Sequence, residues 1–261
     1  MPEQPIRFDD GAAYERLMGV WSASVGAIFL DWLSPTPGQK WIDVGCGNGA
    51  FTERIIQRCA PSEVYGIDPS QAQLAYAAAR PGTKGVVFQQ GDATQLPYDS
   101  DRFDAAIMAL VISFLPDPAK GIAEMARVVR PAGLIAAYMW AYADGGSPIS
   151  VIMEEVSAMG FVPTRPPSPW ASAKDGQHKL WMEAGLERIE AKTISVRRDF
   201  SDFDSFWTIN TAIGPGKATL DRMAKDSIAE FRQRVRARVS PGGGAFTVEA
   251  WANAVKGFVS K

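Results

Sequence analysis

The chain has 261 residues, of which 46% are hydrophobic and 21% are charged, and its net charge is −2. These values are typical of a globular protein that forms one large domain or a domain with a cap. The charge balance argues against general attraction to nucleic acid or to an anionic membrane surface. No apolar run is long enough to cross a bilayer, and we expect no secretory signal and no membrane insertion.

The cysteine and histidine content bears on the redox compartment and on metal binding. The two cysteines, Cys46 and Cys59, flank one predicted helix, so we expect no disulfide framework. A reducing compartment is the simpler interpretation, and we expect a cytoplasmic protein. His178 is the only histidine, and no Cys/His spacing is typical of a metal site, so no metal is predicted.

The first half of the chain alternates between helical and strand patterns. Residues 11–33 have apolar positions at helical spacing, and Ser34–Gly38 ends this pattern. Further on, the expected strands are 41–44, 63–67, 86–89, 103–110 and 134–140, and the expected helices are 51–59, 70–79 and 117–129. Because strands that alternate with helices form parallel sheets with right-handed crossovers, the predicted fold class is α/β.

The second half departs from this alternation. Helices are expected over 149–159, 174–184 and most of 199–240, with a break at Gly214–Gly216, and strands over Arg188–Val196 and Phe246–Ala254. Two insertions would then form a cap over the site. The predicted organisation is an N-terminal helical segment over the site (1–34), a cofactor-binding core (35–141), an insertion or lid (142–172), a core helix and strand (173–198), a helical cap insertion (199–243) and a final core strand (244–261).

The stretch Lys40–Thr52 (KWIDVGCGNGAFT) predicts a strand, a glycine turn and a helix. The glycines of this turn tolerate positive φ and let the backbone approach a ligand closely. The N-terminus of the helix directs free N–H groups into the same space. Asp43 lies at the end of the strand beside the turn, which suits a cationic ligand better than a phosphate.

Acidic residues also follow the next two predicted strands. Ligands of open parallel sheets bind beyond the carboxyl ends of the strands, where Asp68 and Asp92 are expected. From its place after the second strand, Asp68 would accept hydrogen bonds from both hydroxyls of a ribose. Asp92 would accept one from an exocyclic amine. The implied ligand is a nucleoside with a positive charge and no pyrophosphate.

Two alternatives stay open at this point. The turn also fits a dinucleotide-binding pattern with alanine in the last place, and Asp68 would suit NAD equally well, so an NAD(P)-dependent oxidoreductase on a related fold is one alternative. A non-catalytic cofactor-binding protein is the other. Asp43 and the segment GDATQLP (91–97) favour the charged nucleoside. A phosphate loop is missing, because Gly216-Lys217 is followed by Ala218.

Four motifs in order resemble those of class I S-adenosylmethionine-dependent methyltransferases, the broad family that includes the ubiquinone/menaquinone-type C-methyltransferases. They are IDVGCGNG (42–49), VYGIDPS (64–70), GDATQLPYDSDRFD (91–104) and EMARVVRPAGLI (124–135), within a resemblance that covers Tyr14 to Trp140. The resemblance implies a Rossmann-like seven-stranded sheet of order 3-2-1-4-5-7-6 with the last strand antiparallel, a position that Phe246–Ala254 fits. The helical segment 199–244 departs from the family, which has a short connection there.

The resemblance also implies a cofactor and its site. The implied methyl donor is S-adenosyl-L-methionine, and S-adenosyl-L-homocysteine is the product. The glycine turn would cradle the methionine part, Asp68 would hold the ribose, Asp92 with Ala93 would frame the adenine, and Met108–Leu110 would pass beneath the sulfonium. The predicted cofactor-binding residues are Asp43, Gly45, Cys46, Gly47, Asn48, Gly49, Asp68, Pro69, Asp92, Ala93, Met108, Ala109 and Leu110.

Purely structural roles compete at several of these positions. Asp68 before Pro69-Ser70 also fits a helix-start cap, and Asp92 also fits a turn. Cys46 is expected to fill space in the turn rather than to react. Downstream, His178 is expected on the surface. The arginines at 232, 234, 236 and 238 are expected to spread over two faces of a solvated helix.

We expect methyl transfer by in-line displacement to a small, partly apolar acceptor, because the insertions and aromatic residues favour an enclosed pocket. Tyr14, Trp21, Trp140 and Tyr142 are the candidate substrate contacts. No catalytic residue is assigned, and Tyr14 and His178 are the candidates for a general base. Nucleic acid is not expected, because Ala109–Ile112 stands where amino-methylating nucleic-acid enzymes carry an Asn/Asp-Pro-Pro-aromatic motif. The acceptor atom and the oligomeric state stay open.

Overall fold

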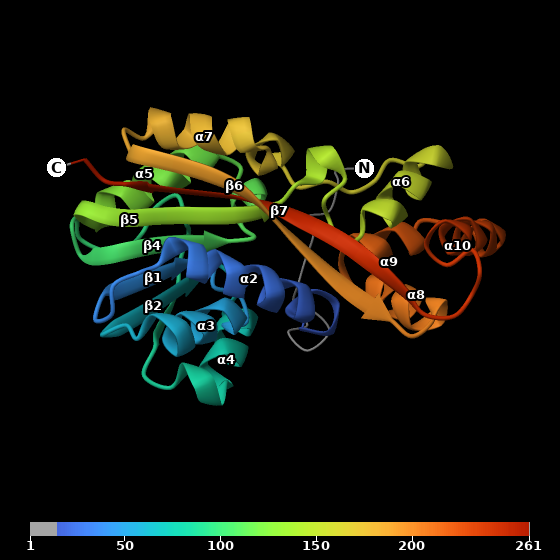
Figure 1. Ribbon diagram of the computed structural model, residues 1–261, viewed down its shortest axis with the longest axis horizontal. Helices are drawn as coiled ribbons and strands as arrows, with labels where there is room; N and C mark the ends of the chain where they lie inside the picture. The colour runs from blue at the N-terminus through green and yellow to red at the C-terminus, as the bar shows by residue number, and fades with distance from the viewer. Residues whose placement is uncertain (1–14, 261) are drawn as a thin grey trace.

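The computed structural model describes residues 15–260. Their central feature is a mixed sheet of seven strands (Figure 1). The strand order is β3-β2-β1-β4-β5-β7-β6, and β7 is antiparallel to both of its neighbours, whereas the first five strands are parallel. The predicted fold class and strand order are confirmed. The strands are β1 (Lys40–Val44), β2 (Glu63–Asp68), β3 (Val87–Gln90), β4 (Phe103–Ala109), β5 (Val129–Trp140), β6 (Glu187–Phe200) and β7 (Phe246–Phe258).

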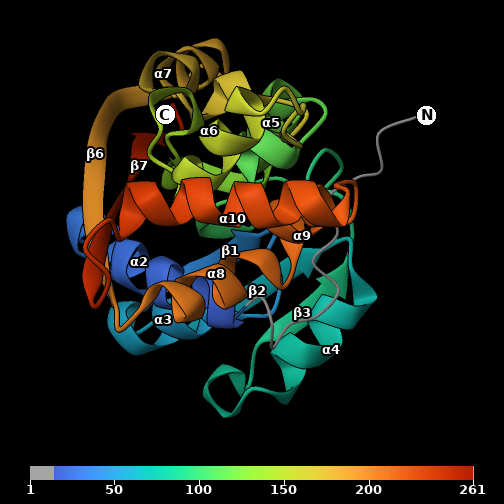
Figure 2. The same cartoon turned by 90° about the vertical axis from the view of Figure 1, so that its right-hand side faces the viewer.

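Helices cover both faces of this sheet. On one side lie α2 (Val20–Leu33), α3 (Ala50–Cys59) and α4 (Gln71–Ala79), and on the other lie α5 (Pro118–Val128) and α7 (Lys174–Glu183) (Figures 1 and 2). Right-handed crossovers require this division, because the chain passes outward from β1 to β3 and in the opposite direction from β4 to β5. Of the predicted helix 11–33, the structure describes a π-helical turn, η1 (Glu15–Gly19), followed by α2, whereas 11–14 lie outside the described residues.

Short polar side chains cap the N-termini of two core helices, α4 and α5. Ser70 caps α4, where its hydroxyl accepts a hydrogen bond from the Gln73 N–H at 3.4 Å. Asp117 caps α5 by accepting from the Lys120 N–H at 3.0 Å, and Pro118 occupies the first helical position. These caps place the turns before α4 and α5 at the carboxyl edge of the sheet, where a ligand would bind.

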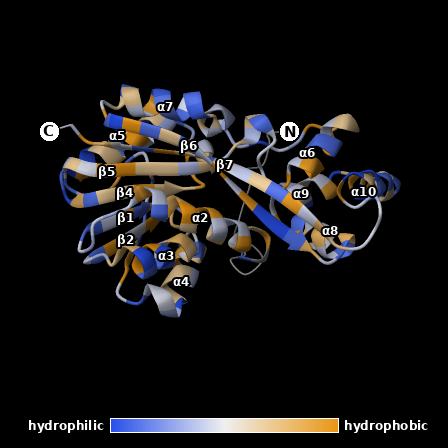
Figure 3. Cartoon of the chain, viewed as in Figure 1, coloured by the Kyte–Doolittle hydropathy of each residue, from blue (hydrophilic) through white to orange (hydrophobic). Residues whose placement is uncertain are grey.

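The hydrophobic core lies between the central strands and the helices. Residues of β4 and β5 such as Ala106, Ile107 and Ala136 are fully buried, as expected of strands that are covered on both faces. Figure 3 shows the contrast between β5, which is coloured mostly hydrophobic, and α10 (Lys225–Val239), which is coloured mostly hydrophilic. Among the described residues no helix combines the length and the apolar character that crossing a membrane requires.

A helical cap is carried by a ribbon of two strands. Strand β7 pairs with β5 only over Ala252–Phe258, whereas β6 pairs with β7 as far as Phe200 and Phe246. The far part of β6 and β7 therefore projects beyond the core, with α8 (Phe203–Thr211), α9 (Gly214–Leu220) and α10 at its end (Figure 1). Helix α6 (Ser150–Ala158) packs against α9 and α10, so the two predicted insertions meet in space.

Two expectations for the cap were wrong in detail. Gly214–Gly216 does not break a helix but begins α9, with Pro215 in its first turn, and the breaks fall at 212–213 and 221–224. Proline is compatible with a first helical turn because its missing N–H has no intrahelical partner there. Strand β6 also continues to Phe200, four residues beyond the predicted Val196, because it pairs with β7 outside the core sheet.

Candidate functional site

The glycine turn between β1 and α3 is held by left-handed backbone at three positions. Gly45, Gly47 and Gly49 have φ values of +77°, +51° and +77°. A Cβ atom at Gly45 would lie 2.5 Å from a methyl group of Val111, whereas one at Gly47 would meet nothing within 4 Å. Glycine is therefore required at Gly45 by both conformation and space, and at Gly47 by conformation alone.

The amide groups of this turn are largely used within the protein. The N–H groups of Gly45 and Cys46 donate to the Ile67 carbonyl at 2.7 and 3.0 Å, and that of Gly47 donates to the Asp68 carboxylate at 2.9 Å. The N–H of Gly49 donates to the Cys46 carbonyl at 2.9 Å. A turn that binds pyrophosphate keeps such groups free for the ligand. This turn consequently provides a shaped surface rather than an anion cradle.

Asp43 is a buried carboxylate directly beneath the turn. Its Oδ2 accepts a hydrogen bond from the Thr52 hydroxyl at 2.6 Å, and its Oδ1 is buried without a partner among the described residues. Burial raises the pKa of Asp43 from 3.8 to about 7, against the Thr52 hydrogen bond, which lowers it, and repulsion from Asp68 raises it further. An unpaired buried oxygen with this pKa is poised to ionise when a cation approaches.

Asp68 links the end of β2 to the glycine turn. Its two carboxylate oxygens accept hydrogen bonds from the N–H groups of Gly47, at 2.9 Å, and Ser70, at 2.8 Å. The helix cap itself is Ser70. Burial raises the pKa of Asp68, although both backbone hydrogen bonds oppose the shift. Asp68 therefore holds the turn in place, and each oxygen keeps a further lone pair for a ligand hydroxyl.

Asp92 has the features of a turn residue. It is exposed, and its Oδ1 accepts hydrogen bonds from the Thr94 N–H at 2.7 Å and the Thr94 hydroxyl at 2.8 Å. These bonds lower the pKa of Asp92, so it is ionised at neutral pH. Asp92 also lines the cavity described next, so the turn role and ligand binding are compatible.

A cavity of about 900 Å³ opens beyond the carboxyl ends of the central strands and under the cap. It brings together most of the predicted cofactor residues: Asp43, Gly45, Cys46, Gly47, Asn48, Asp68, Pro69, Asp92, Ala93, Ala109 and Leu110. The structure does not bring Gly49 or Met108 to the cavity wall. Gly49 packs against Ala77 of α4, and Met108 is fully buried on β4. Burial raises the pKa of Cys46 well above its ordinary value, so its thiol stays protonated.

The predicted substrate contacts divide into three groups. Trp140 and Tyr142 line the cavity. Trp21 does not line it, because its side chain is 1% exposed and packs edge-on against Trp140 with ring centroids 6.4 Å apart. Tyr14 lies outside the described residues. His178 is exposed on α7 and does not line the cavity, which removes it as a candidate base.

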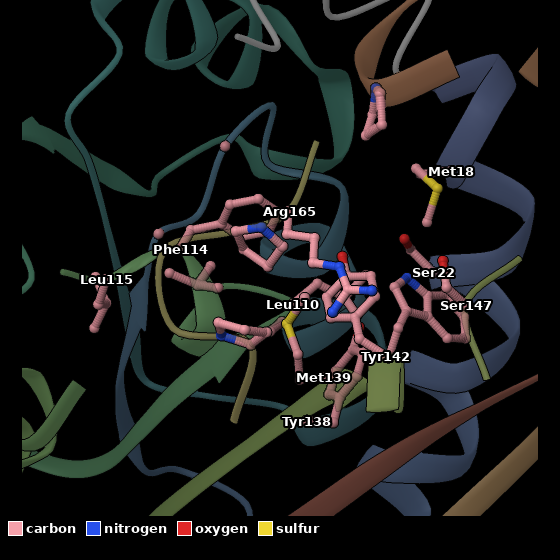
Figure 4. A pocket seen from close by; sticks show the side chains of 18 of the residues that line it. Met18, Ser22, Leu110, Phe114, Leu115, Tyr138, Met139, Tyr142, Ser147 and Arg165 are labelled. Carbon is pink, nitrogen blue, oxygen red and sulfur yellow. The ribbon is translucent and has the colours of Figure 1, made fainter. Parts of the chain in front are cut away.

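Several cavity residues escaped the sequence reasoning. Met18 and Ser22 enter from the N-terminal helical segment, Phe114 and Leu115 from the turn after β4, and Arg165 from the proline-rich segment 161–170 (Figure 4). The apolar residues before β1 and after β4 predicted buried segments, but they did not predict which side chains of these segments would face a ligand. Among the described residues, no cluster of His, Cys, Asp and Glu could hold a metal ion.

Comparison with known proteins gives consistent results over the core. Residues 42–137 match a family model described as a methyltransferase domain. A 93-residue segment is 41% identical to 2-methyl-6-phytyl-1,4-hydroquinone methyltransferase 2 of Oryza sativa subsp. japonica, covering 36% of this chain and 27% of that protein. Another, of 133 residues, is 30% identical to nocamycin O-methyltransferase of Saccharothrix syringae, covering 47% of this chain and 48% of that protein. The matched segments span at most about half the length of these relatives.

A solved structure extends the likeness of the fold beyond this segment. Phosphoethanolamine N-methyltransferase 2 of Haemonchus contortus, in complex with S-adenosyl-L-methionine, superposes with a TM-score of 0.60 at 18% identity, covering 97% of this chain and 58% of that chain. At this identity the match concerns the fold alone.

Proposed function

We propose that this chain, which belongs to the class I S-adenosylmethionine-dependent methyltransferases, transfers a methyl group from S-adenosyl-L-methionine to a small, partly apolar acceptor. One observation carries the proposal. Beside a turn whose N–H groups are largely satisfied within the protein, Asp43 presents a buried, unpaired carboxylate oxygen. That pairing suits a cationic nucleoside and not a pyrophosphate.

The residues present fit such a donor. Asp43 would balance its positive charge, Asp68 would accept hydrogen bonds from its ribose hydroxyls, and Gly45 and Gly47 leave room for close approach of the turn. When bound, this cofactor supplies an electrophilic methyl group on a positively charged sulfur. The cavity of about 900 Å³ lies at the upper end of the range for ligand pockets, which is roughly 300–1,000 Å³, so it has room for two reactants.

Positioning is the catalytic contribution that this site favours. The cap covers the cavity and much of the wall is apolar, and holding two reactants in line contributes roughly 7–11 kcal/mol in well-oriented reactions. Among the described residues that line the cavity there is no histidine, and Asp43, whose pKa burial raises to about 7, would be occupied by the charge of the donor. We therefore propose that the acceptor either needs no deprotonation or arrives already ionised.

The rival function, hydride transfer with NAD(P), is disfavoured by the turn and by the sheet. The amide groups of the turn are largely used within the protein, and the Rossmann order 3-2-1-4-5-6 lacks the antiparallel strand that β7 inserts next to β5. A non-catalytic role in binding the cofactor is compatible with the same contacts, and only turnover separates it from the proposal.

Calorimetric titration with S-adenosyl-L-homocysteine and, separately, with NADH tests the proposal. We expect micromolar binding of the former and none of the latter. Asp68→Asn should weaken the former by about 1–3 kcal/mol, because one oxygen that accepts from the ligand or from Gly47 becomes a donor. Asp175→Asn, on the exposed side of α7, is the matched control. No binding of S-adenosyl-L-homocysteine at high micromolar concentration would refute the proposal.

A further inference from the structure

Arg165 is the only lysine, arginine or histidine among the described residues that line the cavity. In Figure 4 its side chain points into the cavity, toward the side where Tyr142 and Ser147 lie. It comes from the proline-rich segment 161–170, and so from the cap side, whereas three of the four acidic residues of the cavity wall lie at or just beyond the carboxyl ends of the core strands β1 to β3. The fourth, Glu154, belongs to α6 on the cap side.

The guanidinium of Arg165 has no hydrogen-bond or ion-pair partner among the described residues. Two arginines of α10 are paired: Arg234 contacts Glu155 at 2.8 Å, and Arg238 contacts Glu154 at 2.6 Å. Glu154 also lines the cavity, so the acidic side chain on the cap side is already occupied by Arg238. Arg165 is thus left to interact with what enters the cavity.

The segment that carries Arg165 is anchored rather than loose. At one end the Val162 carbonyl accepts a hydrogen bond from Arg222 at 2.9 Å. At the other end Ser168 donates its N–H to the Ser113 carbonyl at 3.0 Å and its hydroxyl to the Leu115 carbonyl at 2.8 Å. Prolines on both sides of Arg165 restrict the backbone further. An anchored segment lowers the entropic cost of holding the guanidinium on a ligand.

The neighbouring wall is apolar but offers further hydrogen-bond donors. Phe114, Met139 and Met153 contribute apolar surface. The hydroxyl of Ser22 and the indole N–H of Trp140 are buried without a partner among the described residues, and both residues line the cavity. A cationic donor would be repelled by Arg165, so this basic group suits the second reactant. A ligand with acceptor oxygens and an apolar body would suit Arg165 and this wall.

We propose that the methyl acceptor is an apolar molecule that carries a carboxylate, and that Arg165 binds this carboxylate. The inference rests on the proposed function, because it concerns the second ligand of the same cavity. Arginine matches a carboxylate with two parallel N–H donors, which gives orientation as well as affinity. An acceptor held at its carboxylate would present the opposite end of its apolar body to the donor.

Two probes with the same apolar body test this proposal. The affinities of 2-naphthoate and of 2-naphthalenemethanol are measured by calorimetry, both without and with saturating S-adenosyl-L-homocysteine. We expect the carboxylate to bind about tenfold more tightly than the alcohol, as for a hydrogen bond to a charged group. Arg165→Gln should abolish this preference and Arg165→Lys should retain part of it. Arg197→Gln, at an exposed arginine of β6, should leave it unchanged.

The outcomes separate the two proposals. Equal affinity for both probes, failure of both to bind, or a preference that survives in Arg165→Gln would overturn the role of Arg165. A loss of S-adenosyl-L-homocysteine binding in Arg165→Gln would also overturn it, since the guanidinium would then serve the donor's own carboxylate. Failure of S-adenosyl-L-homocysteine to bind the wild-type protein would instead refute the proposed function. The affinities of the two probes measured without S-adenosyl-L-homocysteine would still test the role of Arg165.

Discussion

Replacing Asp43 by asparagine removes a buried carboxyl whose titration should be visible in the stability of the whole protein. Burial raises the pKa of Asp43 to about 7 in the folded state, whereas in the unfolded chain it returns to 3.8. Between these values the unfolded chain releases a proton that the folded protein keeps. The stabilising contribution of the protonated carboxyl is therefore fully present below pH 3.8 and is lost as the pH rises through about 7.

The magnitude follows from the size of this shift. Each pKa unit corresponds to 1.36 kcal/mol, so a shift of about three units lowers the free energy of unfolding by about 4 kcal/mol between pH 4 and pH 8. Asparagine does not titrate. The free energy of unfolding of Asp43→Asn, taken relative to wild type, should therefore rise by about 4 kcal/mol over this range. Titrating groups that do not interact with Asp43 cancel in the difference.

Urea denaturation of both proteins at half-unit pH steps measures this difference. Thr52→Val provides an internal check, because the Thr52 hydroxyl lowers the pKa of Asp43 and its removal should move the upper end of the window to higher pH. Below pH 7, binding of a cationic donor should also release a proton in the wild type but not in Asp43→Asn. A stability difference that stays constant from pH 4 to pH 8 would refute the assignment of a raised pKa to this residue.

Two further predictions concern the turn and the helix above it. In urea titrations, Gly45→Ala should lower the free energy of unfolding by about 1–3 kcal/mol more than Gly47→Ala does. Both positions have positive φ, but only a side chain at Gly45 would collide with Val111. Equal effects of the two substitutions would show that Val111 moves aside. Trp21→Ala should cost about 3–5 kcal/mol of stability, because Trp21 is a buried core residue. At temperatures where this variant is folded, its affinity for S-adenosyl-L-homocysteine should match that of the wild type. A large loss of affinity would show that Trp21 contributes to ligand binding.

Some site features were readable because they are local in the chain. Asp43 and Asp68 stand at strand ends that periodicity locates, and the carboxyl ends of parallel strands share one edge of the sheet. The structure places both beside the glycine turn, where Asp68 accepts the Gly47 N–H. Met108 shows the limit of this reasoning. Ala109 is the last residue of β4 and Leu110 follows it, so both reach the cavity at the carboxyl edge of the sheet, whereas Met108 lies within the strand and is buried.

Other features depend on contacts between distant segments. Trp21 and Trp140 are both aromatic residues near the predicted site, but only the packing of α2 on the sheet decides that Trp21 is covered and Trp140 lines the cavity. The proline-rich segment predicted an irregular connection and nothing about Arg165. Its position follows from hydrogen bonds of Ser168 to Ser113 and Leu115, more than 50 residues away in the chain.

The sequence by itself determined the α/β alternation, the family resemblance, the strand order that this resemblance implies, and the acidic residues at the strand ends, because each depends on local periodicity or on motifs of consecutive residues. Only the tertiary structure decided the length of β6 and β7, the meeting of α6 with α10 and the entry of Arg165 into the cavity. These depend on pairing between segments far apart in the chain, whose free energy comes from burial and hydrogen bonds that no single segment contains.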